Sequence, residues 1–85
     1  MDKEQIYAVI KKHILENLDD LQEKDIDPQK SMKDYGANSL DIIEVVSCSM
    51  RELQIKIPRS ELADIKTIDE LAEKFLATAK TESVQ

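Results

Sequence analysis

The residue with the clearest chemical potential is Ser39, which follows a short loop that contains the only glycine of the chain, Gly36. Asn38 can cap a helix that begins at Ser39, and Asp41, three residues later, completes an acidic form of the capping box. A phosphate ester at such a helix start would meet free backbone N–H groups and the positive end of the helix dipole. Serine is also a common capping residue, and these residues alone favour that structural role.

Other kinds of reactive site find little support in the sequence. A serine nucleophile needs a base, but the single histidine, His13, lies in a different predicted helix, where a structural or surface role is favoured. The acidic pairs in the segment 19–27 lack the ligand spacing of a calcium loop. One glycine cannot form a glycine-rich phosphate loop. We therefore predict no catalytic residue and no metal site.

Cys48 is the only cysteine, so the fold cannot depend on an intramolecular disulfide. The residue is predicted on the outer face of a helix between Glu44 and Glu52. Because these acidic neighbours disfavour the thiolate, a tolerated small side chain is favoured over a redox role.

The composition indicates a small, soluble, all-α domain. The chain has 85 residues with one glycine and two prolines, and its many straight-chain residues favour helix. A net charge of −6 would repel nucleic acid. No apolar stretch approaches the roughly 20 residues of a membrane span or resembles a signal peptide. We expect a cytoplasmic monomer that binds neither nucleic acid nor membrane.

Three longer helices and one short helix are predicted. The first covers about residues 3–18, where apolar residues recur on one face: Ile6, Ile10, Ile14, Leu18 and Leu21. The periodicity fails over 19–38, which is predicted to be a long loop. Ser31 and Asp34 can start one short helical turn there, and three apolar residues can pin the loop to the core: Ile26, Met32 and Tyr35.

The second helix is predicted from Ser39 to about Leu53, with two different faces. One face is apolar and is expected to join the core: Ile42, Ile43, Val46, Met50 and Leu53. The other is expected to be a docking face for partners: Leu40, Asp41, Glu44, Ser47, Cys48, Arg51 and Glu52.

Residues 54–59 are predicted as an extended connector, because Pro58 follows the alternating run and no second strand can pair with it. Ser60 is expected to cap a short helix over 61–65. Thr67 and Glu70 form a capping box for a last helix with an apolar stripe: Ile68, Leu71, Ala72, Phe75 and Ala79. We predict one domain over 1–80 and a disordered tail over 81–85.

The segment Gly36–Asp41, G-A-N-S-L-D, resembles the G-x-D-S-L-D signature around the modified serine of acyl carrier proteins. The resemblance covers nearly the whole chain. Ile26 and Pro28 are similar to the family's early loop motif, and Ile57-Pro58 is similar to the pair after its second helix. The helix order matches the family's four-helix bundle. The resemblance therefore implies an acyl-carrier-type fold and favours modification of Ser39.

The resemblance also implies a function. A phosphopantetheinyl transferase, served by Mg²⁺, would move 4′-phosphopantetheine from coenzyme A to the Ser39 hydroxyl. Acyl cargo would then ride as a thioester on the arm, and the chain itself would catalyse nothing. Leu40, Asp41 and Glu44 match family positions that contact partners. Docking to basic surfaces of acyltransferases, ketosynthases or β-branching synthases is therefore expected.

The chain departs from the family pattern at Asn38, Met50 and Arg51. Asn38 stands where the family usually has an aspartate that can help a transferase bind Mg²⁺. Met50 and Arg51 lie in a part of the second helix that is commonly acidic in fatty-acid carriers, and both join the predicted docking residues. These departures favour a discrete bacterial carrier from a polyketide antibiotic pathway, including carriers that donate acyl groups for β-branching.

Two alternatives stay open. A fatty-acid carrier or a peptidyl or aminoacyl carrier would share the bundle and the serine. A helical interaction module without a prosthetic group would use the acidic face of the second helix, and Ser39 would be only a capping-region residue.

Overall fold

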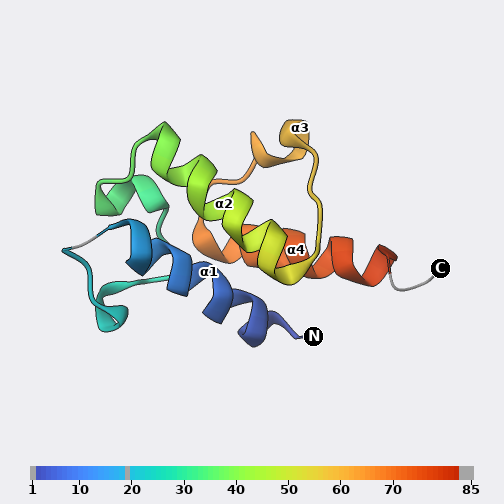
Figure 1. Ribbon diagram of the computed structural model, residues 1–85, viewed down its shortest axis with the longest axis horizontal. Helices are drawn as coiled ribbons and strands as arrows, with labels where there is room; N and C mark the ends of the chain where they lie inside the picture. Colours follow the sequence, from blue (N-terminus) through green and yellow to red (C-terminus); the bar gives the residue numbers. More distant parts are fainter. Residues whose placement is uncertain (1, 19, 83–85) are drawn as a thin grey trace.

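The computed structural model describes residues 2–18 and 20–82 and consists of three long helices, one short helix and two 3₁₀ helices (Figure 1). In chain order the segments are α1 (Lys3–Asn17), η1 (Glu23–Asp25), η2 (Met32–Tyr35), α2 (Ser39–Leu53), α3 (Arg59–Leu62) and α4 (Ile68–Glu82). No strand occurs within the described ranges. The all-α prediction is confirmed, with each long helix beginning where it was expected.

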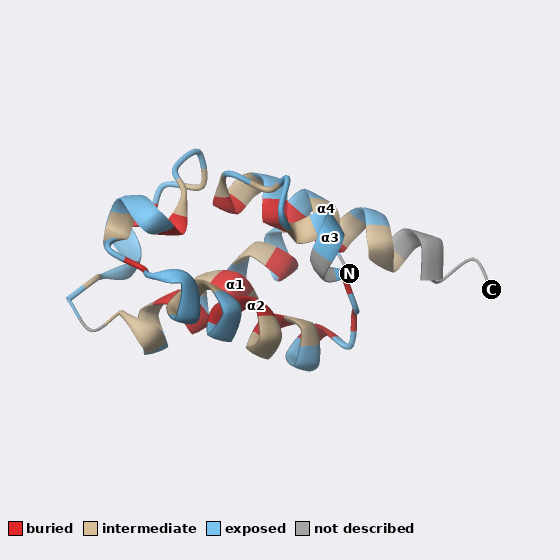
Figure 2. Ribbon diagram, turned by 90° about the horizontal axis from the view of Figure 1, so that it is seen from above, coloured by how far each residue is buried: buried red, intermediate tan, exposed pale blue. Residues whose placement is uncertain are grey.

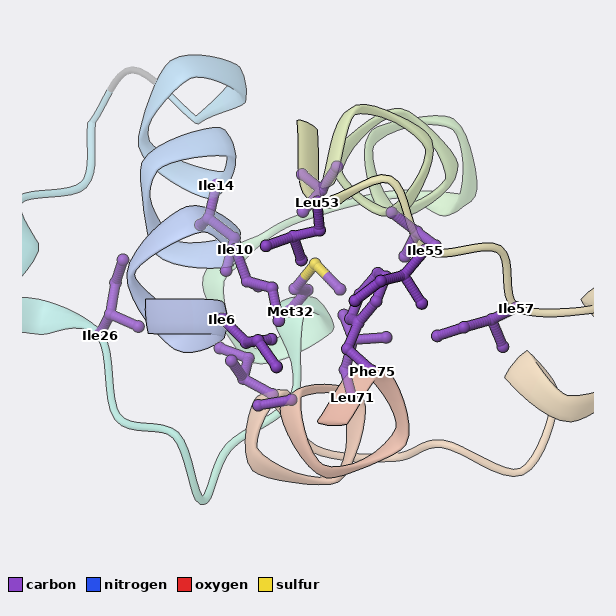
Figure 3. Packing of buried hydrophobic residues seen from close by; sticks show 14 of the residues in the cluster. Ile6, Ile10, Ile14, Ile26, Met32, Leu53, Ile55, Ile57, Leu71 and Phe75 are labelled. Atoms are coloured by element: carbon purple, nitrogen blue, oxygen red, sulfur yellow. The ribbon is translucent and has the colours of Figure 1, made fainter. Parts of the chain in front are cut away.

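The core lies between the three long helices, and α1 packs against both α2 and α4. Side chains from all three helices converge in this space (Figure 3). The buried apolar residues are Ile6, Ile10 and Ile14 of α1, Val45, Val46 and Leu53 of α2, and Ile68, Leu71, Ala72 and Phe75 of α4. The apolar stripe predicted for α4 is thus confirmed, although Ala79 is only partly buried. The stripe of α1 is confirmed for its three isoleucines, whereas Leu18 and Leu21 lie beyond the end of the helix and are partly buried.

The long first loop is held against the helices rather than being free. Ile26, Met32 and Ala37 are buried, and Tyr35 packs beside them. The backbone carbonyl of Lys30 accepts from the Ile68 N–H at 3.0 Å, and that of Pro28 accepts from the Asp69 N–H at 2.8 Å. The loop therefore satisfies N–H groups at the start of α4 that have no partner within the helix.

The expected helical turn after Ser31 is present as η2. The Ser31 N–H donates to the Asp34 carboxylate at 2.9 Å. A second 3₁₀ turn, η1, was not predicted, and its residues are all exposed. Short turns of this kind carry no apolar periodicity, so their sequence signal is weak.

The predicted core face of α2 is confirmed at Val46 and Leu53, but it was rotated away from the true buried face. Ile43 is 44% exposed, whereas Val45 and Ser49, which were not assigned to the core, are buried. Ile42 and Met50 are partly buried. The buried arc is centred on Ser49, because this side of α2 packs against α1. Hydrophobicity alone favoured Ile43 over a serine.

After α2 the chain forms the expected connector, in which Ile55 and Ile57 are buried and Lys56 is exposed. The short helix differs from the prediction. It begins at Arg59, with Pro58 in the capping position, instead of after Ser60. Proline fixes φ near the helical value, so a helix can begin directly after it.

The last helix begins after Thr67, whose hydroxyl oxygen accepts from the Glu70 N–H at 3.1 Å. The Glu70 carboxylate accepts from the Lys66 N–H rather than from that of Thr67, so half of the predicted capping box forms. Helix α4 continues to Glu82, two residues into the segment predicted as a tail. Residues 83–85 lie outside the described residues.

Replacing Ser49 by alanine is expected to stabilise the fold. The Ser49 hydroxyl is fully buried and has no hydrogen-bond partner in the described structure. An unsatisfied buried polar group costs about 1–3 kcal/mol, so Ser49→Ala should raise the free energy of unfolding by about 1 kcal/mol in urea titrations. The control is Ser47→Ala on the same helix, where only the smaller gain in helix propensity, about 0.5 kcal/mol, is expected. A Ser49→Ala protein less stable than wild type would contradict this account.

Candidate functional site

Ser39 is the first residue of α2, and its side chain is exposed. Two reciprocal hydrogen bonds fix this helix start. The Asn38 side-chain oxygen accepts from the Asp41 N–H at 2.9 Å, and the Asp41 carboxylate accepts from the Asn38 N–H at 3.1 Å. The predicted capping box is confirmed, and it holds the serine hydroxyl at the loop-facing end of the helix.

The turn before Ser39 depends on Gly36, which has a φ of 87°. Its N–H donates to the Lys33 carbonyl at 3.0 Å, and the Ala37 N–H donates to the Met32 carbonyl at 3.2 Å. A Cβ atom at Gly36 would meet nothing within 4 Å, so glycine is favoured there by its backbone angle and not by lack of space. Buried Ala37 then anchors the turn.

The local geometry suits a phosphate ester on Ser39. The N–H groups of Ser39 and Leu40 have no hydrogen-bond partner in the described structure, because they lie in the first turn of the helix. They lie at the positive end of the helix dipole, which favours an anionic group. The residues present therefore fit a phosphopantetheine group, which supplies a terminal thiol that can carry acyl groups.

The structure does not bring His13 to Ser39. The two ring nitrogens of His13 lie 3.1 Å from the Glu16 carboxylate and 2.9 Å from that of Glu52. Glu52 lies at the far end of α2, roughly 20 Å from Ser39 at about 1.5 Å per residue. His13 is buried in this contact between α1 and α2, which confirms its structural role.

Glu52 was expected on the docking face but takes part in the same contact. Its carboxylate accepts from the Lys12 ammonium at 2.9 Å, in addition to its contact with His13. The hydrogen bond from Lys12, and secondarily that from His13, lowers the pKa of the Glu52 carboxyl below its usual value. Glu52 therefore belongs to the α1–α2 contact, and this pairing across about 40 positions has no local sequence signal.

The remaining predicted docking residues lie along α2. Leu40 is 76% exposed, and Glu44 and Arg51 are also exposed. Met50 is half-buried, and the Asp41 carboxylate is engaged in the capping box. Leu40 and Ile43, which had been predicted in the core, together form an exposed apolar surface near Ser39. Figure 2 shows the exposed and intermediate positions that alternate with buried ones along the long helices.

The Cys48 thiol donates to the Glu44 carboxylate, with a sulfur–oxygen distance of 3.6 Å. Burial, and secondarily this hydrogen bond, raises the pKa of the Cys48 thiol. The expected influence of Glu44 is present, whereas Glu52 is turned to α1. The thiol therefore stays protonated at neutral pH and is a poor nucleophile.

An apolar groove begins one helical turn beyond Ser39, between α2, α3 and the start of α4. Its volume is about 680 Å³, within the usual range of small-molecule sites. Ile42, Ile43 and Val46 line one wall, and Leu62 and Ile65 line another. Sequence reasoning missed this groove. Its one local signal was the second isoleucine of α2, which had been assigned to the core.

The described residues contain neither a metal site nor a membrane-spanning helix. No group of three or more His, Cys, Asp and Glu side chains there could hold a metal ion. No helix within residues 2–18 and 20–82 has the length and apolar character needed to span a membrane.

Comparisons with known proteins converge on one family. Residues 8–75 match the family model described as a phosphopantetheine attachment site. The polyketide biosynthesis acyl-carrier-protein AcpK of Bacillus subtilis is 38% identical over 73 residues, which are 86% of this chain and 89% of AcpK. The acyl carrier protein of Wolinella succinogenes is 31% identical over 75 residues, covering 88% of this chain and 97% of the relative.

A solved structure agrees in fold. A chain in the crystal structure of the curacin biosynthetic pathway HMG synthase in complex with acetyl donor-ACP is 39% identical, with a TM-score of 0.82. The match covers 91% of this chain and 99% of that chain. The four-helix order predicted from the sequence is therefore shared with a carrier-type bundle.

Asn38→Ala should weaken the start of α2. Loss of an N-cap side chain costs about 1 kcal/mol, whereas Asn38→Asp keeps the cap and adds a favourable charge at the helix N-terminus. In urea titrations we expect Asn38→Ala to be less stable than wild type by about 1 kcal/mol and Asn38→Asp to be at least as stable. Equal stabilities for the two variants would show that the cap does not hold this helix start.

Proposed function

Since this chain belongs to the acyl carrier protein family, whose members carry covalent 4′-phosphopantetheine, we propose that its attachment site is Ser39 and that it delivers acyl groups in polyketide biosynthesis. One observation carries the assignment of the site. Ser39 is an exposed serine at a capped helix start, inside the matched segment 8–75. The chain catalyses none of the steps itself in this proposal.

Loading requires a base that this chain does not place near the serine. The Ser39 oxygen bonds to the phosphorus of coenzyme A that carries the pantetheine. The P–O bond from this phosphorus to the bridging oxygen of the pyrophosphate breaks, and adenosine 3′,5′-bisphosphate leaves. We assign the hydroxyl proton to a base of the transferase, because His13 contacts the far end of α2 and the Asp41 carboxylate is held in the capping box. This chain contributes the hydroxyl and the unpaired N–H groups of Ser39 and Leu40, which stabilise the new phosphate ester.

Two features support a role in delivery. The exposed Leu40 beside the arm offers an apolar anchor to a partner, and Glu44 offers a charge to a basic surface. The groove between α2 and α3 is large enough to shelter a short acyl chain on the arm. Asp41 supports docking indirectly, because its carboxylate is committed to the cap.

The names of two relatives support the proposed pathway. Those at 38% and 39% identity carry names that refer to polyketide and to curacin biosynthesis. This favours a polyketide carrier over a fatty-acid or peptidyl carrier. Because the second is a donor carrier in complex with an HMG synthase, we include a β-branching synthase among the partners, beside a phosphopantetheinyl transferase, acyltransferases and ketosynthases. We place the chain in the cytoplasm, because coenzyme A is available there. We expect it to act as a monomer.

Ser39→Ala should abolish loading. Incubation of wild type with coenzyme A, Mg²⁺ and a permissive transferase is expected to add the mass of one phosphopantetheinyl group, measured on the intact protein. Ser39→Ala should gain nothing, while Ser60→Ala, a matched change at another exposed serine, should load normally. A wild-type mass that stays unchanged with several transferases would refute the proposed site and leave an unmodified interaction module.

Leu40→Ala and Glu44→Lys should slow delivery without unfolding the chain. Both side chains are exposed, so helicity by circular dichroism should change little. Transfer of acyl groups to a partner should fall about tenfold, since a central apolar anchor or a docking charge is each worth about 1–2 kcal/mol. A large loss of helicity would show instead that these residues support the fold.

A further inference from the structure

The surface of α2 carries opposite charges at its two ends. Asp41 and Glu44 lie near Ser39, whereas Arg51 lies in the last turn of the helix and Lys56 follows in the connector. Asp41 and Arg51 are about 15 Å apart along the axis at about 1.5 Å per residue. A chain with net charge −6 thus displays a separate cationic end on this face.

A second groove lies at this cationic end. Its volume is about 570 Å³, and it is lined by Ser47, Met50, Arg51, Gln54, Ile55 and Lys56. Arg51 and Lys56 are exposed, whereas Ile55 is 2% exposed and forms part of an apolar floor with Met50. Ser47 and Met50 also line the groove next to the arm, so the two grooves are neighbours along α2.

Arg51 and Lys56 have no anionic partner within the described residues. Four lysines are paired with carboxylates: Lys3 with Asp69 and Glu73, Lys11 with Glu23, Lys12 with Glu52, and Lys74 with Glu61. Lys24, Lys30, Lys33 and Lys66 are unpaired like Arg51 and Lys56 within the described residues, but only Arg51 and Lys56 line the second groove. Two like charges beside one groove repel each other, and an external carboxylate would relieve this repulsion. The apolar floor would exclude water around such a contact and strengthen it.

We propose that this second groove receives an acidic side chain with an adjacent apolar side chain from the enzyme that accepts the acyl group. The inference rests on the proposed function. The partner then carries a basic surface opposite Glu44 and an acidic group opposite Arg51 and Lys56. Docking in the reverse direction would place like charges together, so the charge order along α2 fixes the orientation in which the arm enters the partner.

The test compares two double charge reversals in the full-length, acetyl-loaded protein, with the curacin-pathway HMG synthase as the acceptor. Arg51→Glu with Lys56→Glu should lower kcat/KM for acetyl transfer about tenfold or more at low salt. The matched control is Lys24→Glu with Lys30→Glu. It makes the same change in net charge at exposed cations of the first loop and should lower kcat/KM less than about threefold. Arg51→Gln with Lys56→Gln should give an intermediate loss.

Equal losses in the two double reversals would reveal a general charge effect and overturn the inference, as would no loss in either. A wild-type dimer in sedimentation that becomes monomeric in Arg51→Glu with Lys56→Glu would assign the groove to a second copy, which also overturns it. Loaded wild type that transfers no acetyl group would instead refute the β-branching part of the proposed function, and the inference with it. The mass of the intact protein, measured before the transfer assay, shows whether Ser39 was loaded. It therefore distinguishes a failure of acetyl transfer from a failure of attachment.

Discussion

The reciprocal hydrogen bonds between Asn38 and Asp41 are the constraint on which the site depends. They start α2 at Ser39, and so they place one hydroxyl outside the helix beside two unpaired backbone N–H groups. The loop before Asn38 brings the chain to that point. Gly36 turns the backbone, Ala37 anchors it, and the carbonyls of the first loop satisfy the start of α4.

The packing of α2 fits the proposed role of presenting cargo to partner enzymes. One side of the helix is committed to α1 and the core, which includes the contact of Glu52 with Lys12 and His13. The other side stays accessible and holds two neighbouring grooves. A domain of this size buries a smaller share of its surface than a larger domain does, and it can present one arm and one free helix face to a series of enzymes.

Local signals predicted the helices well, because caps and apolar periodicity are encoded by nearby residues. Asn38 and Asp41 predicted the start of α2, and the predicted bounds of this helix agree with the structure. The rotation of α2 was wrong because burial of Ser49 is decided by how α2 packs against α1, not by its own polarity. Both grooves and the role of Glu52 arise from contacts between distant segments, which a single sequence does not encode locally. The residues alone did not promote Ser39 above a capping role, and the chain-wide family resemblance was needed.

The central claim is that one particular hydroxyl carries the arm. Its most direct test is tandem mass spectrometry of peptides from protein loaded with phosphopantetheine, which locates the modified residue. The account predicts a single modified position, Ser39, with Ser31, Ser47 and Ser60 unmodified. A phosphopantetheinyl group on any other residue would contradict it.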